Sequence, residues 1–308
     1  MTAVPADTII AHRSTVKDYI ELMKPGVMSL VVFTGMAGML VAQSLGFGHL
    51  HWFQQLMTLL CIALGSGAGG AMNMWYDRDI DAVMARTIKR PVPSGRIAPD
   101  DALAFGLFMA VASVVLMDLA VGWVAGGLLA GAIAFYVVIY TMWLKRSTPQ
   151  NIVIGGAAGA FPPMIGWAAV TGDVSLEPVL LFAIIFLWTP PHFWALALYR
   201  NGDYARAGVP MMPVVAGSVS TKKQMIAYTW ILVAVTLALP LMHMSGMLYA
   251  ASAAILGAIF LFHVYKVRHD ASDKWARKTF GFSILYLFVL YTMLMVDSWL
   301  VQLGLLAL

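Results

Sequence analysis

Nine apolar runs follow one another along the chain, separated by short polar or charged stretches. A helix needs about 20 mostly apolar residues to cross the hydrocarbon layer of a membrane, and each run is close to that length. The pattern predicts an all-α, polytopic membrane protein with nine transmembrane helices in a single domain over residues 1–308. The expected spans are 27–45, 52–75, 103–120, 123–143, 152–170, 179–199, 225–242, 247–267 and 280–301.

Composition agrees with this interpretation. The 308 residues are 61% hydrophobic and 11% charged, whereas a soluble domain carries about 25% charged residues. Such a chain could not cover its surface with polar groups in water, so membrane lipid is its expected surroundings and nucleic acid is not an expected partner. The single cysteine, Cys61, excludes a disulfide within the chain.

Charge separates the loops into two groups. With nine spans, successive loops alternate between the two sides of the membrane. The N-terminal segment 1–25 and the second, fourth, sixth and eighth loops lie on one side. All 19 Lys and Arg residues fall in these segments or in the helix ends beside them. The loops of the other end carry none, but include Asp173 and Glu177. Because basic residues are retained in the cytoplasm, we expect a cytoplasmic N-terminus and a periplasmic C-terminus.

The N-terminal segment carries Asp7, Asp18 and Glu21 among its first 21 residues. Secretory signals have an apolar core, and mitochondrial transit peptides are poor in acids. Neither description fits, so the simplest interpretation is a multi-pass protein of the bacterial inner membrane.

Three oxygen-bearing side chains lie at the cytoplasmic end of the second predicted span. Asn73, Asp77 and Asp81 are spaced four residues apart, which places them on one face of a helix. Mg²⁺ takes oxygen ligands, and it usually shares its coordination shell with substrate phosphates. We therefore predict that these three residues are metal ligands and catalytic, with Mg²⁺ as the cofactor; the alternative is an ordinary solvated helix end.

Basic residues follow the acidic motif directly. Arg86, Lys89, Arg90 and Arg96 lie in a loop that prolines keep from being helical. Carboxylates followed by cations suit a metal-bridged diphosphate, because metal and cations together neutralise the leaving group. Alternatively, these residues serve only to fix topology.

At these residues the chain resembles the UbiA-type intramembrane prenyltransferases, whose first aspartate-rich motif reads NxxxDxxxD. Within that family it is most similar to the branch that farnesylates haem. The segments that carry the resemblance extend over about two-thirds of the chain. They are 21–26, 73–81 with 89–95, 140–148 with 151, 155–163, 188–195 and 203–211.

The resemblance implies a reaction. Farnesyl diphosphate would ionise, and the farnesyl group would join a vinyl side chain of haem b; water would complete the new side chain, giving haem O and diphosphate. A haem A synthase or a terminal oxidase would be a partner downstream. The wider family has a second aspartate-rich motif after the sixth span, where this chain has a single acid, Asp203.

Two further clusters are assigned mainly through the resemblance. Lys145 and Arg146, with Thr148 and Asn151, would form a second clamp on the diphosphate, or else only anchor the fourth span in the membrane. The cluster after the sixth span would bind substrate opposite the first motif. Its members are Arg200, Asp203, Tyr204 and Arg206.

His192 lies inside the sixth span, directly after Pro190 and Pro191. Prolines in a membrane helix free backbone carbonyls, so a neutral histidine could simply satisfy one of them. An axial ligand for haem iron is the functional alternative, because histidine is a common haem ligand and ionisable groups inside a span are often functional. Tyr136 and Tyr140 would line the prenyl tunnel, or only pack between helices.

Two rival functions remain at this stage. One is a prenyltransferase of the same family that acts on an aromatic quinone precursor. The other is a transporter, in which broken helices and buried polar groups are common. A transport pathway should place polar groups at several depths, whereas the charge here is concentrated at one end.

Overall fold

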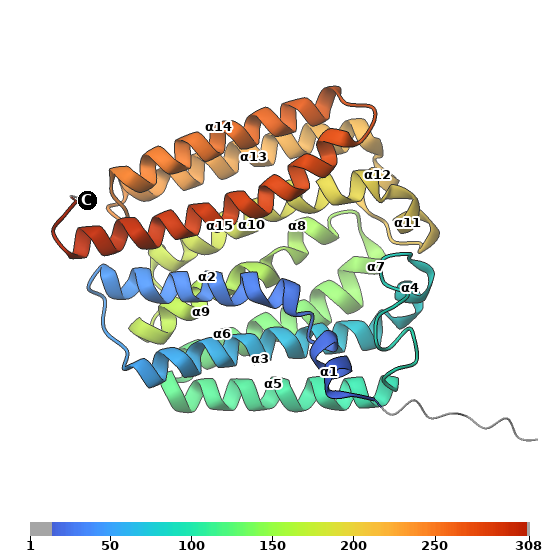
Figure 1. The fold of residues 1–308 in the computed structure, drawn as a ribbon, viewed down its shortest axis with the longest axis horizontal. Helices are drawn as coiled ribbons and strands as arrows, with labels where there is room; N and C mark the ends of the chain where they lie inside the picture. The colour runs from blue at the N-terminus through green and yellow to red at the C-terminus, as the bar shows by residue number, and fades with distance from the viewer. Residues whose placement is uncertain (1–13, 307–308) are drawn as a thin grey trace, which may run out of the picture.

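The computed structural model describes residues 14–306, and within that range it is helical with no β-strand. Residues 1–13 of the predicted N-terminal segment lie outside the described residues. In the part of the chain that the structure describes, six short helices lie between or before the long ones (Figure 1). The short ones are α1 (Val16–Leu22), α4 (Arg78–Val83), α7 (Lys145–Ser147), α8 (Asn151–Gly155), α11 (Asn201–Arg206) and α12 (Met212–Val215).

The long helices confirm the nine predicted spans. Among the described residues, nine helical segments are long and apolar enough to cross a membrane, so the chain is a multi-pass membrane protein. They are α2 (Pro25–Ser44), α3 (Trp52–Tyr76), α5 (Pro99–Val121), α6 (Trp123–Ala134) continued by η1 (Phe135–Leu144) and α7, α8 with α9 (Ala157–Thr171), α10 (Leu176–Tyr199), α13 (Gly217–Leu241), α14 (Met247–His269) and α15 (Lys274–Gln302).

Two helices begin well before their predicted spans. The seventh span was expected from residue 225 but α13 begins at Gly217, and the ninth was expected from 280 but α15 begins at Lys274. The added turns carry lysines and an arginine, which lower the hydropathy without breaking the helix. Hydropathy therefore located the apolar part of each helix and missed its polar first turns.

The short helices α1, α4, α7, α11 and α12 gather at one end of the bundle, on the right in Figure 1, and the C-terminus lies at the other. The basic loops thus share one end, as an odd number of spans requires. Which end faces the cytoplasm stays a prediction.

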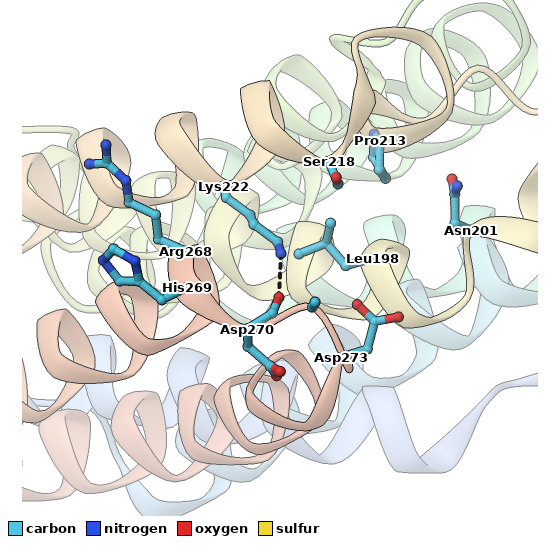
Figure 2. A pocket seen from close by; sticks show the side chains of 10 residues that line it. Leu198, Asn201, Pro213, Ser218, Lys222, Arg268, His269, Asp270 and Asp273 are labelled. Carbon is cyan, nitrogen blue, oxygen red and sulfur yellow. Dashed lines mark hydrogen bonds between the residues drawn. The ribbon is translucent and has the colours of Figure 1, made fainter.

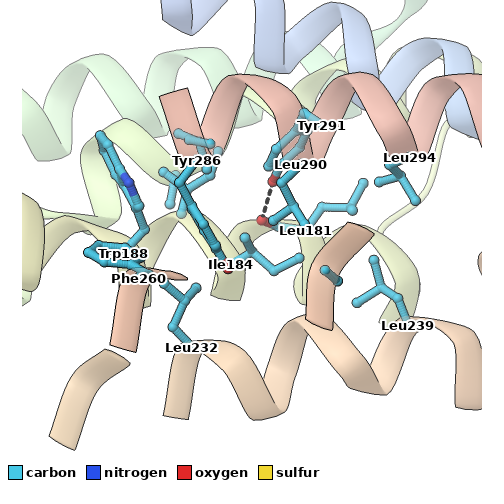
Figure 3. Close-up of a cluster of buried hydrophobic side chains, with 14 of the residues drawn as sticks. Leu181, Ile184, Trp188, Leu232, Leu239, Phe260, Tyr286, Leu290, Tyr291 and Leu294 are labelled. Carbon is cyan, nitrogen blue, oxygen red and sulfur yellow. Dashed lines mark hydrogen bonds between the residues drawn. The ribbon is translucent and has the colours of Figure 1, made fainter. Parts of the chain in front are cut away.

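The largest part of the core lies between α10 and the three C-terminal helices (Figure 3). Phe260, Tyr286 and Leu290 are fully buried there. The Tyr291 hydroxyl donates a 2.7 Å hydrogen bond to the backbone oxygen of Leu181, which joins α15 to α10. This bond gives the buried Tyr291 hydroxyl the partner that an apolar core would otherwise not provide.

Helices α2 and α9 pack unusually closely. A Cβ added at Gly38 would lie 2.0 Å from the carbonyl oxygen of Pro163, and one added at Gly166 would lie 2.0 Å from that of Gly35. Lipid tails are as apolar as leucine, so membrane helices gain stability from backbone approach at small residues. These glycines fix the α2–α9 distance.

The fourth span changes its helical type near its end. Residues Phe135–Leu144 form the π-helix η1, which runs directly into Lys145. A π-helix is wider than an α-helix and often marks a functional site. Nothing in the sequence predicted it, because its residues are ordinary helix and strand formers.

Candidate active site

The acidic motif lies where α3 ends and α4 begins. Asp77 separates the two helices, yet its N–H donates to the carbonyl of Asn73 (2.9 Å) and its own carbonyl accepts from Asp81 N (2.8 Å). The helical hydrogen-bond pattern therefore continues through the junction. Asn73, Asp77 and Asp81 are 4%, 0% and 2% exposed, so this polar motif is buried in the protein.

Asp77 is held by a residue of its own helix and by one from the fourth span. Its carboxylate accepts a hydrogen bond from the Lys145 ammonium, the first residue of α7, and a 2.8 Å bond from Asn73 Nδ2, one turn earlier on α3. Asn73 Nδ2 also donates to Thr141 Oγ1 on η1 (2.9 Å). The predicted clamp residue Lys145 thus contacts the acidic motif, and the end of the fourth span supplies both the Lys145 and the Thr141 contact.

Asp81 pairs with the basic loop. Arg90 Nη1 lies 2.7 Å from Asp81 Oδ2, and the Thr87 hydroxyl donates to the Asp81 carbonyl (2.9 Å). The loop therefore folds back over the acidic motif, as the metal-diphosphate hypothesis expects.

Lys24 is a site residue that sequence reasoning did not select. Its Nζ donates to Asn73 Oδ1 at 2.5 Å. Burial lowers the pKa of Lys24 to about 7, and the positive charge of Arg90 contributes in the same direction. Lys24 lies in segment 21–26, which carries part of the family resemblance, but a lysine directly before Pro25 is also typical of an ordinary membrane anchor.

Arg146 binds Asp79 more closely than it binds the motif. Its guanidinium binds both carboxylate oxygens of Asp79 (2.8 and 2.7 Å) and lies over the Tyr76 ring at 4.8 Å, while its distance to Asp77 is 3.5 Å. These hydrogen bonds lower the pKa of Asp79 to about 2. A cavity of about 360 Å³ beside this pair also contacts Trp75.

The other basic-loop residues have different surroundings. Burial raises the pKa of Tyr204 on α11, and the positive charge of Arg86 opposes that shift. Lys89 is exposed. Arg96 forms ion pairs with Asp18 and with Glu21 (2.9 Å), and these tie the loop to α1. Arg96 was predicted to contact substrate, but here its guanidinium holds the loop against α1.

The cluster after the sixth span lies at the same end. Asp203 is 7% exposed and pairs with Arg206 and, at 3.7 Å, with Arg200. Tyr204 of α11 and Ile80 of α4 belong to one apolar cluster. Helices α4 and α11 therefore contribute to the same cluster, although they lie more than 100 residues apart in the sequence.

Thr148 and Asn151 belong to the turn into α8. The Thr148 hydroxyl accepts from the backbone N–H of Gln150 (3.2 Å), which is a local turn contact. Asn151 is fully buried, and neither its amide oxygen nor its amide nitrogen has a hydrogen-bond partner among the described residues. A buried amide without partners is costly, so Asn151 fits a residue that receives a ligand.

His192 is held by its neighbours in one orientation. Its ring is stacked between Trp188 (centroids 4.2 Å apart) and Phe280 (4.7 Å), and its Nδ1 lies 2.7 Å from Ser283 Oγ. The Ser283 hydroxyl itself donates to the Phe280 carbonyl. Nδ1 must then carry the proton, which leaves a lone pair on Nε2.

A further cavity lies at the same end of the molecule but away from the motif (Figure 2). It measures about 510 Å³ and is lined by residues of α10 to α15, including Lys222 and Asp273. The Lys222 ammonium donates to the Asp270 carbonyl at 2.6 Å. No predicted site residue lines this cavity.

The motif fits a metal that completes its coordination with substrate. Within residues 14–306, no three His, Cys, Asp or Glu side chains converge as a protein-only metal site does. Asn73, Asp77 and Asp81 instead supply three hard oxygen ligands beside several cations. This donor set suits Mg²⁺, which binds through one or two carboxylates together with phosphates and water.

The comparison with protein families settles the class of protein. The model of the UbiA prenyltransferase family matches residues 31–287. The chain belongs to the UbiA prenyltransferase family. The acidic motif at the end of α3 and the basic loop after it therefore lie in an established prenyltransferase fold.

Relatives within the family are close in sequence. Proteins named protoheme IX farnesyltransferase are 56% identical in Parvibaculum lavamentivorans, over 92% of this chain and 89% of that one, and 57% identical in Agrobacterium fabrum, over 91% and 89%. The protein of that name in Acidiphilium cryptum is 54% identical over 96% of each chain.

Solved structures share the fold at low identity. A digeranylgeranylglyceryl phosphate synthase structure matches with a TM-score of 0.76 and 19% identity, covering 92% of this chain and 98% of that one. A UbiA homologue from Archaeoglobus fulgidus, bound to GPP and Mg²⁺, matches with a TM-score of 0.63 and 16% identity, covering 91% and 99%. Both confirm the helical architecture.

Proposed function

We propose that this protein transfers the farnesyl group of farnesyl diphosphate to a vinyl group of haem b, giving haem O and diphosphate. The observation that carries the proposal is the set of relatives named protoheme IX farnesyltransferase, at 54–57% identity over nine-tenths or more of this chain. The charge-rich site at the end of α3 supports it.

Mg²⁺ is the proposed cofactor, held by Asn73, Asp77 and Asp81. When bound it would neutralise charge on the diphosphate oxygens. That the Archaeoglobus homologue was solved with GPP and Mg²⁺ supports the same metal and ligand class here. Lys145 and Arg90 already touch the motif and would face the diphosphate; the predicted roles of the other basic residues stay proposals.

The chain assists cleavage of the C–O bond by electrostatics. The electron pair leaves with the diphosphate, where preplaced cations meet the developing negative charge. Tyr136 and Tyr140 stack with centroids 5.6 Å apart on η1, the segment that also positions Lys145. Their ring faces would stabilise the allylic cation. The vinyl carbon of haem then bonds to farnesyl C1, and water adds to the resulting cation with loss of a proton.

His192 is the proposed axial ligand of haem iron. A ligating histidine normally donates its other ring N–H to a fixed acceptor, which orients the ring. Ser283 is such an acceptor for Nδ1, and Nε2 is left with its lone pair. Stacking between Trp188 and Phe280 holds the ring plane.

The proposed location is the bacterial inner membrane, with the active site at the cytoplasmic face. The confinement of all 19 Lys and Arg residues to one set of loops supports this orientation. A haem A synthase or a terminal oxidase as downstream partner stays an expectation from the family resemblance.

A product assay with purified protein in lipid nanodiscs tests the proposed function. Farnesyl diphosphate and Mg²⁺ are supplied with either haem b or 4-hydroxybenzoate, and products are identified by mass spectrometry. Haem O is expected only with haem b. Prenylated hydroxybenzoate without haem O would assign the protein to the rival acceptor class, and movement of substrate across vesicles without any product would favour transport.

A further inference from the structure

Each polar side chain of the acidic motif is engaged by a cation from a different part of the chain. Lys24 binds Asn73, and Lys145 binds Asp77. The third pair joins Arg90 and Asp81, 2.7 Å apart. One oxygen of each of the three side chains, Asn73 Oδ1, Asp77 Oδ2 and Asp81 Oδ2, is thus already engaged by a cation.

These cations and a metal ion exclude one another. Mg²⁺ binds an oxygen at 2.0–2.1 Å, whereas Lys24 Nζ lies 2.5 Å from Asn73 Oδ1 and Arg90 Nη1 lies 2.7 Å from Asp81 Oδ2. Two cations on the same oxygen repel each other strongly in a partly buried site. Binding of Mg²⁺ therefore requires these cations to move.

Displaced cations need a new anion. Removing one partner of a buried pair is costly because the other charge is left uncompensated. When Lys24 is protonated, Lys24, Lys145 and Arg90 together outnumber Asp77 and Asp81 by one positive charge. A complex of Mg²⁺ with a trianionic prenyl diphosphate carries one negative charge. Binding of this complex therefore neutralises the net charge of the three cations and two carboxylates. Mg²⁺ alone would make the cluster more positive, and diphosphate alone would make it negative.

Lys24 is the cation best placed to move. Its partner Asn73 is a neutral amide, so it leaves no carboxylate behind. It has a left-handed backbone conformation (φ 56°) at the junction of α1 and α2, where α1 is fixed from its other side by Arg96. A half-buried lysine that lies beside two other cations and pairs with no carboxylate among residues 14–306 points to an anion that arrives from outside.

We infer that Lys24 is a diphosphate-binding residue, and that Lys24, Lys145 and Arg90 pass from the acidic motif to the diphosphate as Mg²⁺ takes their place. Metal and diphosphate consequently bind together, and neither binds well alone. The inference rests on the proposed function of this site, but it does not depend on which acceptor receives the farnesyl group.

Calorimetry on the full chain in nanodiscs tests the exchange. The titrants are Mg²⁺ alone, farnesyl thiolodiphosphate alone, and each in the presence of the other. We expect each to strengthen binding of the other by on the order of tenfold or more, equally in both directions because coupling is reciprocal. Equal Mg²⁺ affinity with and without the diphosphate analogue would overturn the inference.

Substitutions separate the exchange from a structural role. Lys24→Gln and Lys145→Gln should weaken binding of the diphosphate analogue, and Lys145→Gln should also strengthen binding of Mg²⁺ alone, because Asp77 is then free. Lys24→Arg should keep most of the coupling. Lys17→Gln, which removes a charge from an exposed position on α1, is the matched control and should change neither affinity.

Two outcomes distinguish this inference from the proposed function. The calorimetry contains no haem. If the wild type shows the expected coupling between Mg²⁺ and the diphosphate analogue but makes no haem O in the product assay, haem b is not the acceptor and the cation exchange is still supported. If the wild type makes haem O but Lys24→Gln and Lys145→Gln leave the coupling unchanged, only the cation exchange is contradicted. Thermal unfolding of each variant confirms that it is folded.

Discussion

Asp77 and Asp79 are two residues apart and have opposite surroundings. Asp77 is fully buried between Lys145 and Asn73, whereas the Asp79 side chain is 62% exposed and binds only Arg146 among the described cations. Asp77→Asn should lower kcat by about 10²-fold or more, the effect of removing one preorganised charged group. Asp79→Asn should cost no more than a few-fold, because exposed ion pairs contribute little. Initial rates of haem O formation measure both; equal losses would place Asp79 in the catalytic machinery.

His192 permits a second test at the same scale. His192→Ala should shift the Soret band of the haem-loaded protein and weaken haem binding, because the proposed iron ligand is lost, but leave binding of farnesyl thiolodiphosphate unchanged. Ser283→Ala should weaken haem binding less, because it removes only the acceptor that orients the ring. His49→Gln, at an exposed position, is the control. An unchanged haem spectrum in His192→Ala would assign the residue to packing.

At the scale of elements, the α2–α9 contact is the most sensitive to added volume. Gly38→Ala would place a methyl group 2.0 Å from the Pro163 carbonyl oxygen, and backbone cannot yield as a side chain can. We expect a loss of about 1–3 kcal/mol of stability, as for overpacked cores, visible as a lower Tm in detergent. Gly127→Ala in α6, where nothing lies within 4 Å, should not lower the Tm; equal effects would contradict the proposed contact.

The corner between α14 and α15 depends on one carboxylate. Asp270 accepts from the N–H and hydroxyl of Ser272 and from Trp275 N, and these bonds lower its pKa to about 2. A lowered pKa means that the stabilisation is complete above the unfolded pKa of about 3.9. It should be lost as pH falls from about 4 through 2.

Asp270→Asn should therefore lower the Tm at pH 7 by a few degrees and flatten its fall between pH 4 and 2. Asp273→Asn is a matched control, because asparagine tolerates the left-handed conformation at that position, and it should resemble the wild type. An Asp270→Asn variant with the wild-type pH profile would show that other groups control acid unfolding.

At the scale of the whole molecule, orientation can be tested with cysteines. In a Cys61→Ala background, Asp100→Cys marks the end with the basic loops and Asp173→Cys marks the other; both positions are exposed. A membrane-impermeant maleimide should label only Asp173→Cys in spheroplasts and both variants after lysis. Labelling of Asp100→Cys alone in spheroplasts would invert the proposed topology.

The nine spans and the acidic motif followed from the sequence by itself. Spanning helices are set by local hydropathy, because lipid forces every backbone group to find a partner within its own segment. Likewise, the spacing of Asn73, Asp77 and Asp81 is a property of one turn of helix after another. Both predictions needed no knowledge of distant residues.

Only the tertiary structure decided which cation serves which oxygen. Lys24 reaches Asn73 across 49 residues, and Lys145 reaches Asp77 across 68. In the folded chain, Arg146 also pairs with Asp79, and Arg96 pairs with Asp18 of α1. Such pairings depend on how helices pack and on the π-helical turns of η1. They produce no repeating pattern of residue types, so they cannot be predicted from the spacing of residues in the sequence. The physical reason is that hydropathy acts within each segment, whereas charge pairing acts between segments.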